Sequence, residues 1–188
     1  MELAKLLKER RSVHVFEDRE VPLETVQELL ETAVWVPNHR MTQPWRFVII
    51  YGDGRKRLGA LNPRGKGGFE KDPAKVAEMA QKFHNKMMGV PMYVVVLMKE
   101  HPVLGVREED YASTSCIIHN LSLLLWEQGI GMVWESYGFM HDTGYREAVG
   151  ACPGEKVVGS LHLGYPERVP AAQARIPASQ LTTVISET

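Results

Sequence analysis

The chain has 188 residues, with 22 lysines and arginines against 23 aspartates and glutamates and a formal net charge of −1. This balance supplies no general field for nucleic acid or an anionic membrane, so neither is expected as a partner. The length fits one domain, residues 1–188, and the absence of a visible secretory signal or lipidation motif predicts a cytoplasmic protein. Only Cys116 and Cys152 are present, so we expect two buried or incidental thiols and neither a disulfide framework nor a metal site.

The first half of the chain is expected to form two amphipathic helices and a strand. Apolar residues recur at helical spacing within residues 3–11 and again within 23–34. The run "WRFVIIY", residues 45–51, is rich in aromatic and β-branched residues and predicts a buried strand. The loop before it, "VPNHRMTQP", combines two prolines with polar side chains directly after Trp35. Binding residues are common on loops that a rigid scaffold holds in place.

The middle of the chain contains a short helix, a glycine-rich stretch and a second strand. Whether the glycine-rich stretch, residues 64–69, acts as a lid is left open by the sequence. A helix is expected over residues 73–88, with Val76, Met79 and Met87 on its apolar side. The continuous apolar run "MYVVVLM", residues 92–98, predicts a strand that is buried on both faces.

A long helix is expected at about residues 108–128. The acids at 108–110 favour a helix N-terminus, and Gly129 is typical of a helix C-terminus. Residues 111–126 contain no charged side chain, which predicts burial on several sides, one of them against a second subunit. The segment is too short and too polar to span a bilayer.

The last third adds strands at residues 132–136 and 155–165, a short capped helix at 141–150 and a proline-containing tail. Helices and strands intermix without a strict βαβ alternation. The predicted fold class is therefore α+β, a mixed three-layer α/β/α domain with a central sheet flanked by helices.

One motif near the N-terminus suggests an anion site. In "KERRSVH", Arg10, Arg11 and Ser12 follow an amphipathic helix, and two guanidinium groups with a hydroxyl suit a phosphate. A solvated basic helix end explains the same residues without a ligand. The motif alone leaves both interpretations open.

The stretch "RRSVHVFEDREVPLETVQELLETAVWVPNHRMTQPWRFVIIYG" resembles the opening signature of the nitroreductase family of FMN-dependent oxidoreductases. Arg-Arg-Ser, an amphipathic helix, a proline-containing turn and Gln-Pro-Trp entering a strand occur in the family's order and spacing. The resemblance continues through the uncharged helix, "EQGIGMVWES" and "KVVGSLHLGYPERVP", and so covers nearly the whole chain. The length and the "PNHR" turn are similar to the small bacterial members.

The resemblance implies a nitroreductase-like FMN-binding fold and a homodimer with FMN sites at the interface, each built from both chains. It also implies that the prolines hold the loop rigid. The cofactor-binding residues implied are Arg10, Arg11 and Ser12 for the phosphate and ribityl chain; Trp35, His39 and either Gln43 or Arg40 for the isoalloxazine pocket; Trp134, Glu135 and Ser136 for the strand along the ring; and Arg175 as a second phosphate-binding arginine. For Trp35, a core position at a helix end is the alternative.

Two positions depart from the family pattern. His14 stands where members commonly have a second basic residue, so its charge depends on pH. Glu135 would place an acid beside a ring whose reduced form is anionic. We therefore expect the Glu135 side chain to point away from the ring or to pair with an arginine.

The resemblance implies an enzyme in which FMN carries the chemistry and no side chain is obliged to be catalytic. NADH or NADPH would deliver hydride to FMN, and an electron-poor acceptor, a nitroaromatic or a quinone, would then use the same open site in a ping-pong cycle. Fold and cofactor do not fix the substrate. Reductive dehalogenation or dehydrogenation, a flavin-binding redox-sensing module with little turnover, and a structural protein without ligand are the alternatives.

Overall fold

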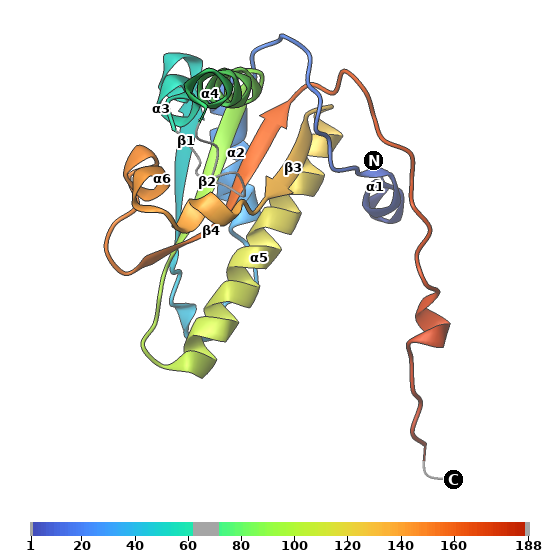
Figure 1. Ribbon diagram of the computed structural model, residues 1–188. Coiled ribbons are helices and arrows are strands. Elements are labelled where there is room, and N and C mark those ends of the chain that lie inside the picture. The colour runs from blue at the N-terminus through green and yellow to red at the C-terminus, as the bar shows by residue number, and fades with distance from the viewer. Residues whose placement is uncertain (1, 62–71, 187–188) are drawn as a thin grey trace.

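The computed structural model describes residues 2–61 and 72–186, so the glycine-rich stretch at 64–69 lies outside the described residues. Short 3-10 turns occur at His39–Met41, Gly52–Arg55, Gly138–His141 and Ala178–Gln180. The helices and strands (Figure 1) are α1 (Leu3–Glu9), α2 (Leu23–Ala33), β1 (Trp45–Tyr51), α3 (Lys56–Gly59), α4 (Pro73–Met88), β2 (Met92–Lys99), α5 (Leu104–Glu127), β3 (Gly131–Glu135), α6 (Thr143–Ala148) and β4 (Glu155–Gly164). The predicted α+β class is confirmed.

The strands form one antiparallel sheet in the order β1-β2-β4-β3. Tyr51, Met92, Leu163 and Met132 lie opposite one another in a row across one end of this sheet. Trp45, at the start of β1, lies at the other end. The start of β1 and the start of β3 are therefore at diagonally opposite corners of the sheet.

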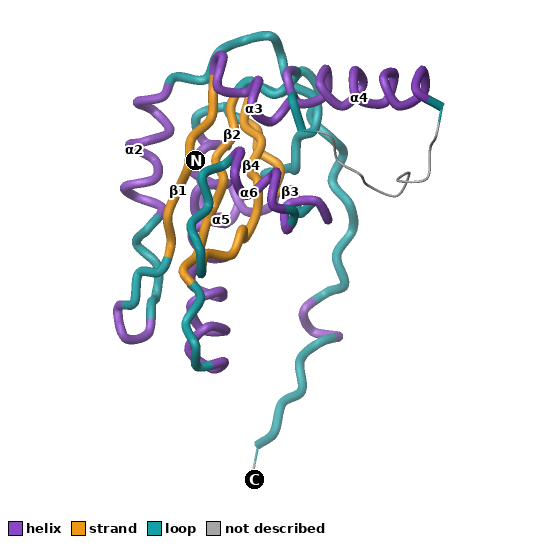
Figure 2. The backbone as a smooth tube through the Cα atoms, turned by 60° about the vertical axis from the view of Figure 1, so that its left-hand side comes forward, coloured by secondary structure: helices purple, strands orange, loops and turns teal. Residues whose placement is uncertain are grey.

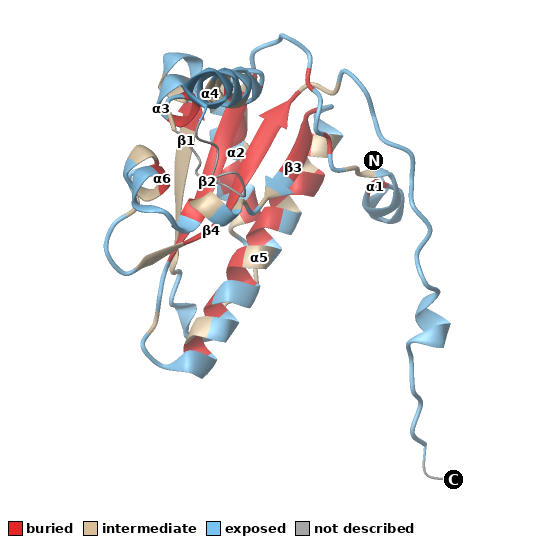
Figure 3. Ribbon diagram, viewed as in Figure 1, coloured by how far each residue is buried: buried red, intermediate tan, exposed pale blue. Residues whose placement is uncertain are grey.

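Helices cover both faces of this sheet. Alternate residues of β2 point to opposite faces, and residues 92–98 are all buried, as Figure 3 shows. One hydrophobic core joins Val94 and Val96 to residues of α2 and α5, and the other joins Val95 and Leu97 to residues of α3, α4 and α6. The predicted strand buried on both faces, within a sheet flanked by helices, is confirmed.

Helix α4 has the predicted bounds, but the structure leaves half of its predicted apolar side uncovered. Met87 is buried, whereas Val76 and Met79 are exposed. Figure 2 shows that the N-terminal half of α4 projects away from the sheet, so only its C-terminal half contacts the core. The helix starts here because the Asp72 carboxylate accepts a hydrogen bond from the Ala74 N–H at 2.9 Å and a proline occupies its first position.

Helix α5 begins at Leu104, earlier than predicted, so the acids at 108–110 occupy its second turn. The helix instead starts directly after a turn in which the Val103 N–H donates a hydrogen bond to His101 Nδ1 at 3.1 Å. Half of the uncharged segment is buried, whereas Tyr111, Ala112, Cys116 and His119 are exposed. Cys152 is also exposed, so neither thiol is buried. No helix in the described ranges is long and apolar enough to cross a membrane.

Candidate functional site

A basic pocket of about 530 Å³ lies between the end of α1 and the C-terminal tail. Ser12 forms a β-bridge with Met132, and the Val13 N–H donates a hydrogen bond to the Met132 carbonyl at 3.2 Å. Gly131 permits this approach, because a Cβ there would lie only 2.7 Å from Val13. The predicted residues that line this pocket are Arg10, Arg11, Ser12, His14 and Arg175.

The pocket has the electrostatics of an anion site. Burial, followed by the nearby cations of Arg11 and Arg175, lowers the pKa of Arg10 from its ordinary value. Arg10 Nε is buried and has no hydrogen-bond partner, and none of the described residues that line the pocket is acidic. A phosphate would pair this orphaned donor and relieve the repulsion among the three guanidinium groups, so the residues fit such a group.

A second pocket of about 420 Å³ adjoins the first and shares His14 with it. Glu135 lies on its wall, where Glu135 Oε1 is 3.6 Å from His14 Nδ1. The Glu135 carboxylate therefore pairs with His14. The alternative in which it pairs with an arginine is wrong. Lys86, from the end of α4, also lines the pocket, with Nζ 4.9 Å from the centroid of the Tyr137 ring.

His162 forms part of the buried end of this second pocket. Only 4% of the residue is exposed, and Nε2 is buried without a hydrogen-bond partner. Burial, helped by the charge of Lys86 and by His14, lowers the pKa of His162 to about 3, so the imidazole is neutral at physiological pH. Burial also raises the pKa of Tyr137, with the Glu135 carboxylate as the second cause.

The strand residues at the site are held by tight backbone packing. Trp134 Nε1 donates a hydrogen bond to the Val158 carbonyl at 3.2 Å, and the indole lies over Gly159, where a Cβ would be 2.1 Å from Nε1. Glu135 follows at the end of β3, and Ser136 is exposed beyond it. The absence of a side chain at 159 therefore fixes Trp134. Along β3 it alternates with Val133 and Glu135, so it points to the opposite face of the sheet from the second pocket.

The predicted loop residues lie elsewhere. Trp35 is 86% exposed, which excludes a core position for it, and His39 and Gln43 are also exposed. They precede β1 at the corner of the sheet diagonally opposite the bridge between Ser12 and Met132. One copy of the chain thus places the basic residues and Glu135 around pockets that share His14, but it does not bring the loop, Trp134 or Ser136 to them.

Comparison with known proteins identifies the family. Residues 7–165 match the sequence profile of the Nitroreductase family. The chain belongs to the nitroreductase family. YfhC of Bacillus subtilis, a candidate NAD(P)H nitroreductase, is 34% identical over 175 residues, which span 93% of this chain and 90% of YfhC.

Solved structures agree with the fold of this nitroreductase-family protein. A nitroreductase-like family protein from Bacillus cereus is 35% identical and superposes with a TM-score of 0.87 over 98% of this chain and 96% of that one. The FMN- and NADPH-dependent nitroreductase NfnB of Sphingopyxis sp. strain HMH is 19% identical, with a TM-score of 0.78 over 99% of this chain and 100% of that one. At that identity the likeness shows the fold alone.

Sequence reasoning missed three residues of the second pocket. Lys86, Tyr137 and His162 come from α4, the segment after β3, and β4. His162 faces Val133 across the sheet, so strand alternation could have placed it on the same face as Val133. No local pattern in the sequence shows that the end of α4, which carries Lys86, meets Tyr137.

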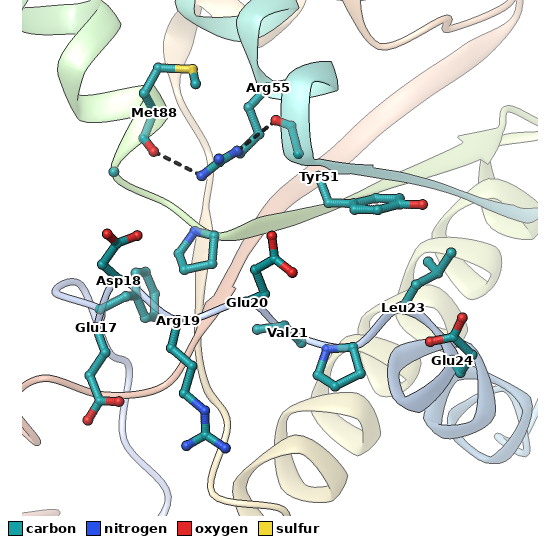
Figure 4. A pocket seen from close by; sticks show the side chains of 15 residues that line it. Glu17, Asp18, Arg19, Glu20, Val21, Leu23, Glu24, Tyr51, Arg55 and Met88 are labelled. Carbon is teal, nitrogen blue, oxygen red and sulfur yellow. Dashed lines mark hydrogen bonds between the residues drawn. The ribbon is translucent and has the colours of Figure 1, made fainter.

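A separate pocket of about 630 Å³ lies under the segment before α2. Figure 4 shows Arg55 in its wall, with the guanidinium directed at backbone carbonyls. Arg55 Nε donates to Gly52 at 2.9 Å, and Nη1 donates to Met88 at 3.0 Å and to Val90 at 3.1 Å. None of the predicted cofactor-binding residues lines this pocket.

Proposed function

We propose that this nitroreductase-family protein is an FMN-dependent oxidoreductase that takes hydride from NADH or NADPH and reduces an electron-poor acceptor, a nitroaromatic or a quinone. The observation that carries the proposal is the basic pocket, with its orphaned Arg10 Nε. It shares His14 with a second pocket that is lined by aromatic and polar side chains. FMN combines a phosphate with a planar, heteroatom-rich ring, and the two adjoining pockets suit those two parts.

In this proposal the two parts of FMN are held by different residues. Arg10, Arg11 and Arg175 hold the phosphate, with Ser12 as a hydroxyl donor. The residues along the ring are Trp134, Glu135 and Ser136 from the chain's own β3 region, and Trp35, His39 and Gln43 from the loop of a second copy. When bound, FMN supplies the two-electron chemistry that links nicotinamide oxidation to acceptor reduction.

The protein's own contribution is orientation and charge. Lys86 and His14 face the second pocket, where a cation stabilises negative charge that develops on a bound ring. The imidazole of His162 at the buried end is neutral, so Lys86 and His14, and not His162, are the candidates for that charge. No acid or base dyad is needed, and donor and acceptor occupy one open site in turn, which gives a ping-pong order.

A homodimer would complete the site. The loop that carries Trp35 is remote from the basic pocket in one chain. Exposed apolar side chains on the loop, on α1 and on the tail provide surface for a second copy: Leu3, Leu7, Trp35, Met41, Ile176, Leu181, Val184 and Ile185. A two-fold arrangement that covers them would let the loop of each copy reach the pocket of the other.

The first experiment is to purify the protein without added cofactor, record the visible spectrum and identify flavin released by denaturation. We expect FMN equimolar with the chain, bleaching on anaerobic addition of NADH or NADPH, and reoxidation by quinone over many turnovers. A colourless protein that does not bind added FMN would refute the proposal. Reduction followed by negligible turnover would favour the redox-sensing module, and turnover only with a halogenated or saturated substrate would favour the dehalogenation or dehydrogenation reading.

A further inference from the structure

The loop that carries His39 and Gln43 has an unusual backbone. Arg40, Met41 and Gln43 have φ values of 63°, 49° and 43°, and within residues 2–61 and 72–186 these are the non-glycine residues with positive φ. Side chains disfavour this left-handed region, so such a conformation persists only where surrounding contacts hold it.

The Asn38 side chain supplies contacts from inside the loop. Its Oδ1 accepts a hydrogen bond from the Gln43 N–H at 2.8 Å. Its Nδ2 donates to Thr42 Oγ1 at 3.1 Å and to Ser113 Oγ at 3.5 Å. One amide thus links the start of the loop to both residues that precede Pro44, and to α5.

Helix α5 supplies the second set of contacts. Asp110, only 2% exposed, accepts a hydrogen bond from the Thr42 hydroxyl. Ser113 Oγ donates to the Pro37 carbonyl at 2.9 Å, and His39 Nδ1 lies 2.8 Å from Glu109 Oε2. Polar side chains on adjacent turns of α5 therefore contact both ends of the loop.

We propose that Asn38 and Asp110 are positioning residues: together they hold Arg40, Met41 and Gln43 in the left-handed backbone that presents His39 and Gln43 to the cofactor. The inference rests on the proposed function, in which this loop lies against FMN bound by a second copy. These hydrogen bonds of Asn38, Thr42, Asp110 and Ser113 form a brace from the chain's own side chains. A loop that the chain itself holds in place does not have to be ordered by FMN, which raises the affinity.

The test uses full-length protein and two readouts. Hydrogen exchange of the Gln43 amide in cofactor-free protein reports the brace directly, since that N–H bonds to Asn38. The FMN dissociation constant and the bound flavin spectrum report its effect on the site. The variants are Asn38→Ala, which removes all the side-chain bonds; Asn38→Asp, which keeps the acceptor for Gln43; and Thr42→Val, which removes the bond to Asp110. Ser115→Ala is the matched control, because the Ser115 hydroxyl bonds only within α5, to the Tyr111 carbonyl.

For Asn38→Ala and Thr42→Val we expect faster hydrogen exchange of the loop amides. We also expect the FMN dissociation constant to rise roughly tenfold, the scale of one hydrogen bond to a group that would otherwise be unsatisfied. Asn38→Asp keeps Gln43 protected. Adding Arg40→Gly to Asn38→Ala restores part of the affinity, because glycine adopts positive φ without steric cost. Ser115→Ala matches the wild type in both readouts.

If hydrogen exchange of the Gln43 amide were unchanged in Asn38→Ala, Asn38 would not hold the loop and the proposal would be overturned. Faster exchange with unchanged FMN affinity and spectrum would overturn its positioning role. If the wild-type protein bound no FMN, the proposed function would fail instead, and the exchange comparison alone would then decide whether Asn38 holds the loop. Should Asn38→Ala not fold, Thr42→Val allows the same comparison of hydrogen exchange and FMN affinity, with a smaller change of the side chain.

Discussion

The imidazole of His162 lies edge-on to the ring of Tyr93, with the ring centroids 4.7 Å apart and the ring planes at 74°. Both side chains are buried, and Tyr137 lies on the other side of the imidazole at 5.9 Å. A protonated imidazole would therefore sit in an apolar and aromatic environment near the ammonium of Lys86. The fold tolerates His162 only in its neutral form.

This arrangement predicts how stability depends on pH. The folded-state pKa of His162 is about 3, below the unfolded value of 6.5, so the unfolded chain binds the extra proton between these values and stability falls as the pH drops. The loss is about 1.4 kcal/mol per pH unit, or about 2 kcal/mol from pH 6.5 to 5. Chemical denaturation of cofactor-free protein should show this slope and lose it in His162→Gln, while the exposed-histidine control His141→Gln keeps it.

Arg10→Gln should have opposite effects with and without cofactor. In the cofactor-free protein the cation is partly buried beside Arg11 and Arg175, so removing its charge leaves the melting temperature equal or higher. FMN binding should weaken by about 1.5–3 kcal/mol, the scale of a hydrogen bond to a charged group. Thermal melts and fluorescence titration with FMN measure the two effects. The exposed control Arg57→Gln should change neither the melting temperature nor FMN binding. A large loss of stability of cofactor-free Arg10→Gln would contradict the repulsion among Arg10, Arg11 and Arg175.

Gly159→Ala should displace the Trp134 side chain. The new Cβ would lie 2.1 Å from Trp134 Nε1, so the indole must leave its hydrogen bond to Val158. Overpacking of this kind costs about 1–3 kcal/mol of unfolding free energy. Denaturant titration and a shift in tryptophan emission would report it. Gly105→Ala, in a helix with nothing within 4 Å of the new Cβ, should instead stabilise the protein by up to about 1 kcal/mol. Unshifted emission in Gly159→Ala would contradict the clash.

Local patterns predicted most of the elements. β1 and α4 have their predicted bounds, and β2 extends the prediction by one residue, Lys99. Each is marked by a pattern within its own sequence: alternating or continuous apolar residues for the strands, and an Asp-Pro start for α4. The start of α5 was wrong because the acids at 108–110 favour an early position in a helix but do not require its first turn.

The site could be predicted only as far as the resemblance reached. Arg10 and Arg175 are far apart in the chain, yet both line the basic pocket. The pairing of Glu135 with His14, and the approach of Lys86 to Tyr137, depend on how β3 lies beside the N-terminal segment and α4. No spacing in the sequence encodes such contacts, because they form only when the sheet brings its edge strand against these segments.

The separation of the loop from the basic pocket leads to a complementation test. If each site combines the pocket of one copy with the loop of the other, Arg10→Gln and the double variant His39→Ala/Gln43→Ala damage different halves of it. Each variant alone should bind FMN weakly and turn over slowly. In mixed dimers, one site would unite the intact pocket of the loop variant with the intact loop of the Arg10 variant. Mixing should therefore restore tight FMN binding and quinone reduction in part of the population.

The matched control for complementation mixes Arg10→Gln with Arg175→Gln. Both substitutions damage the basic pocket, so every site in their mixed dimers contains a damaged pocket and no recovery is expected. Sedimentation should show dimers in all samples, and exchange of labelled chains should confirm that mixed dimers form. Recovery absent from both mixtures despite chain exchange, or FMN bound tightly to a monomer, would place the complete site in one chain.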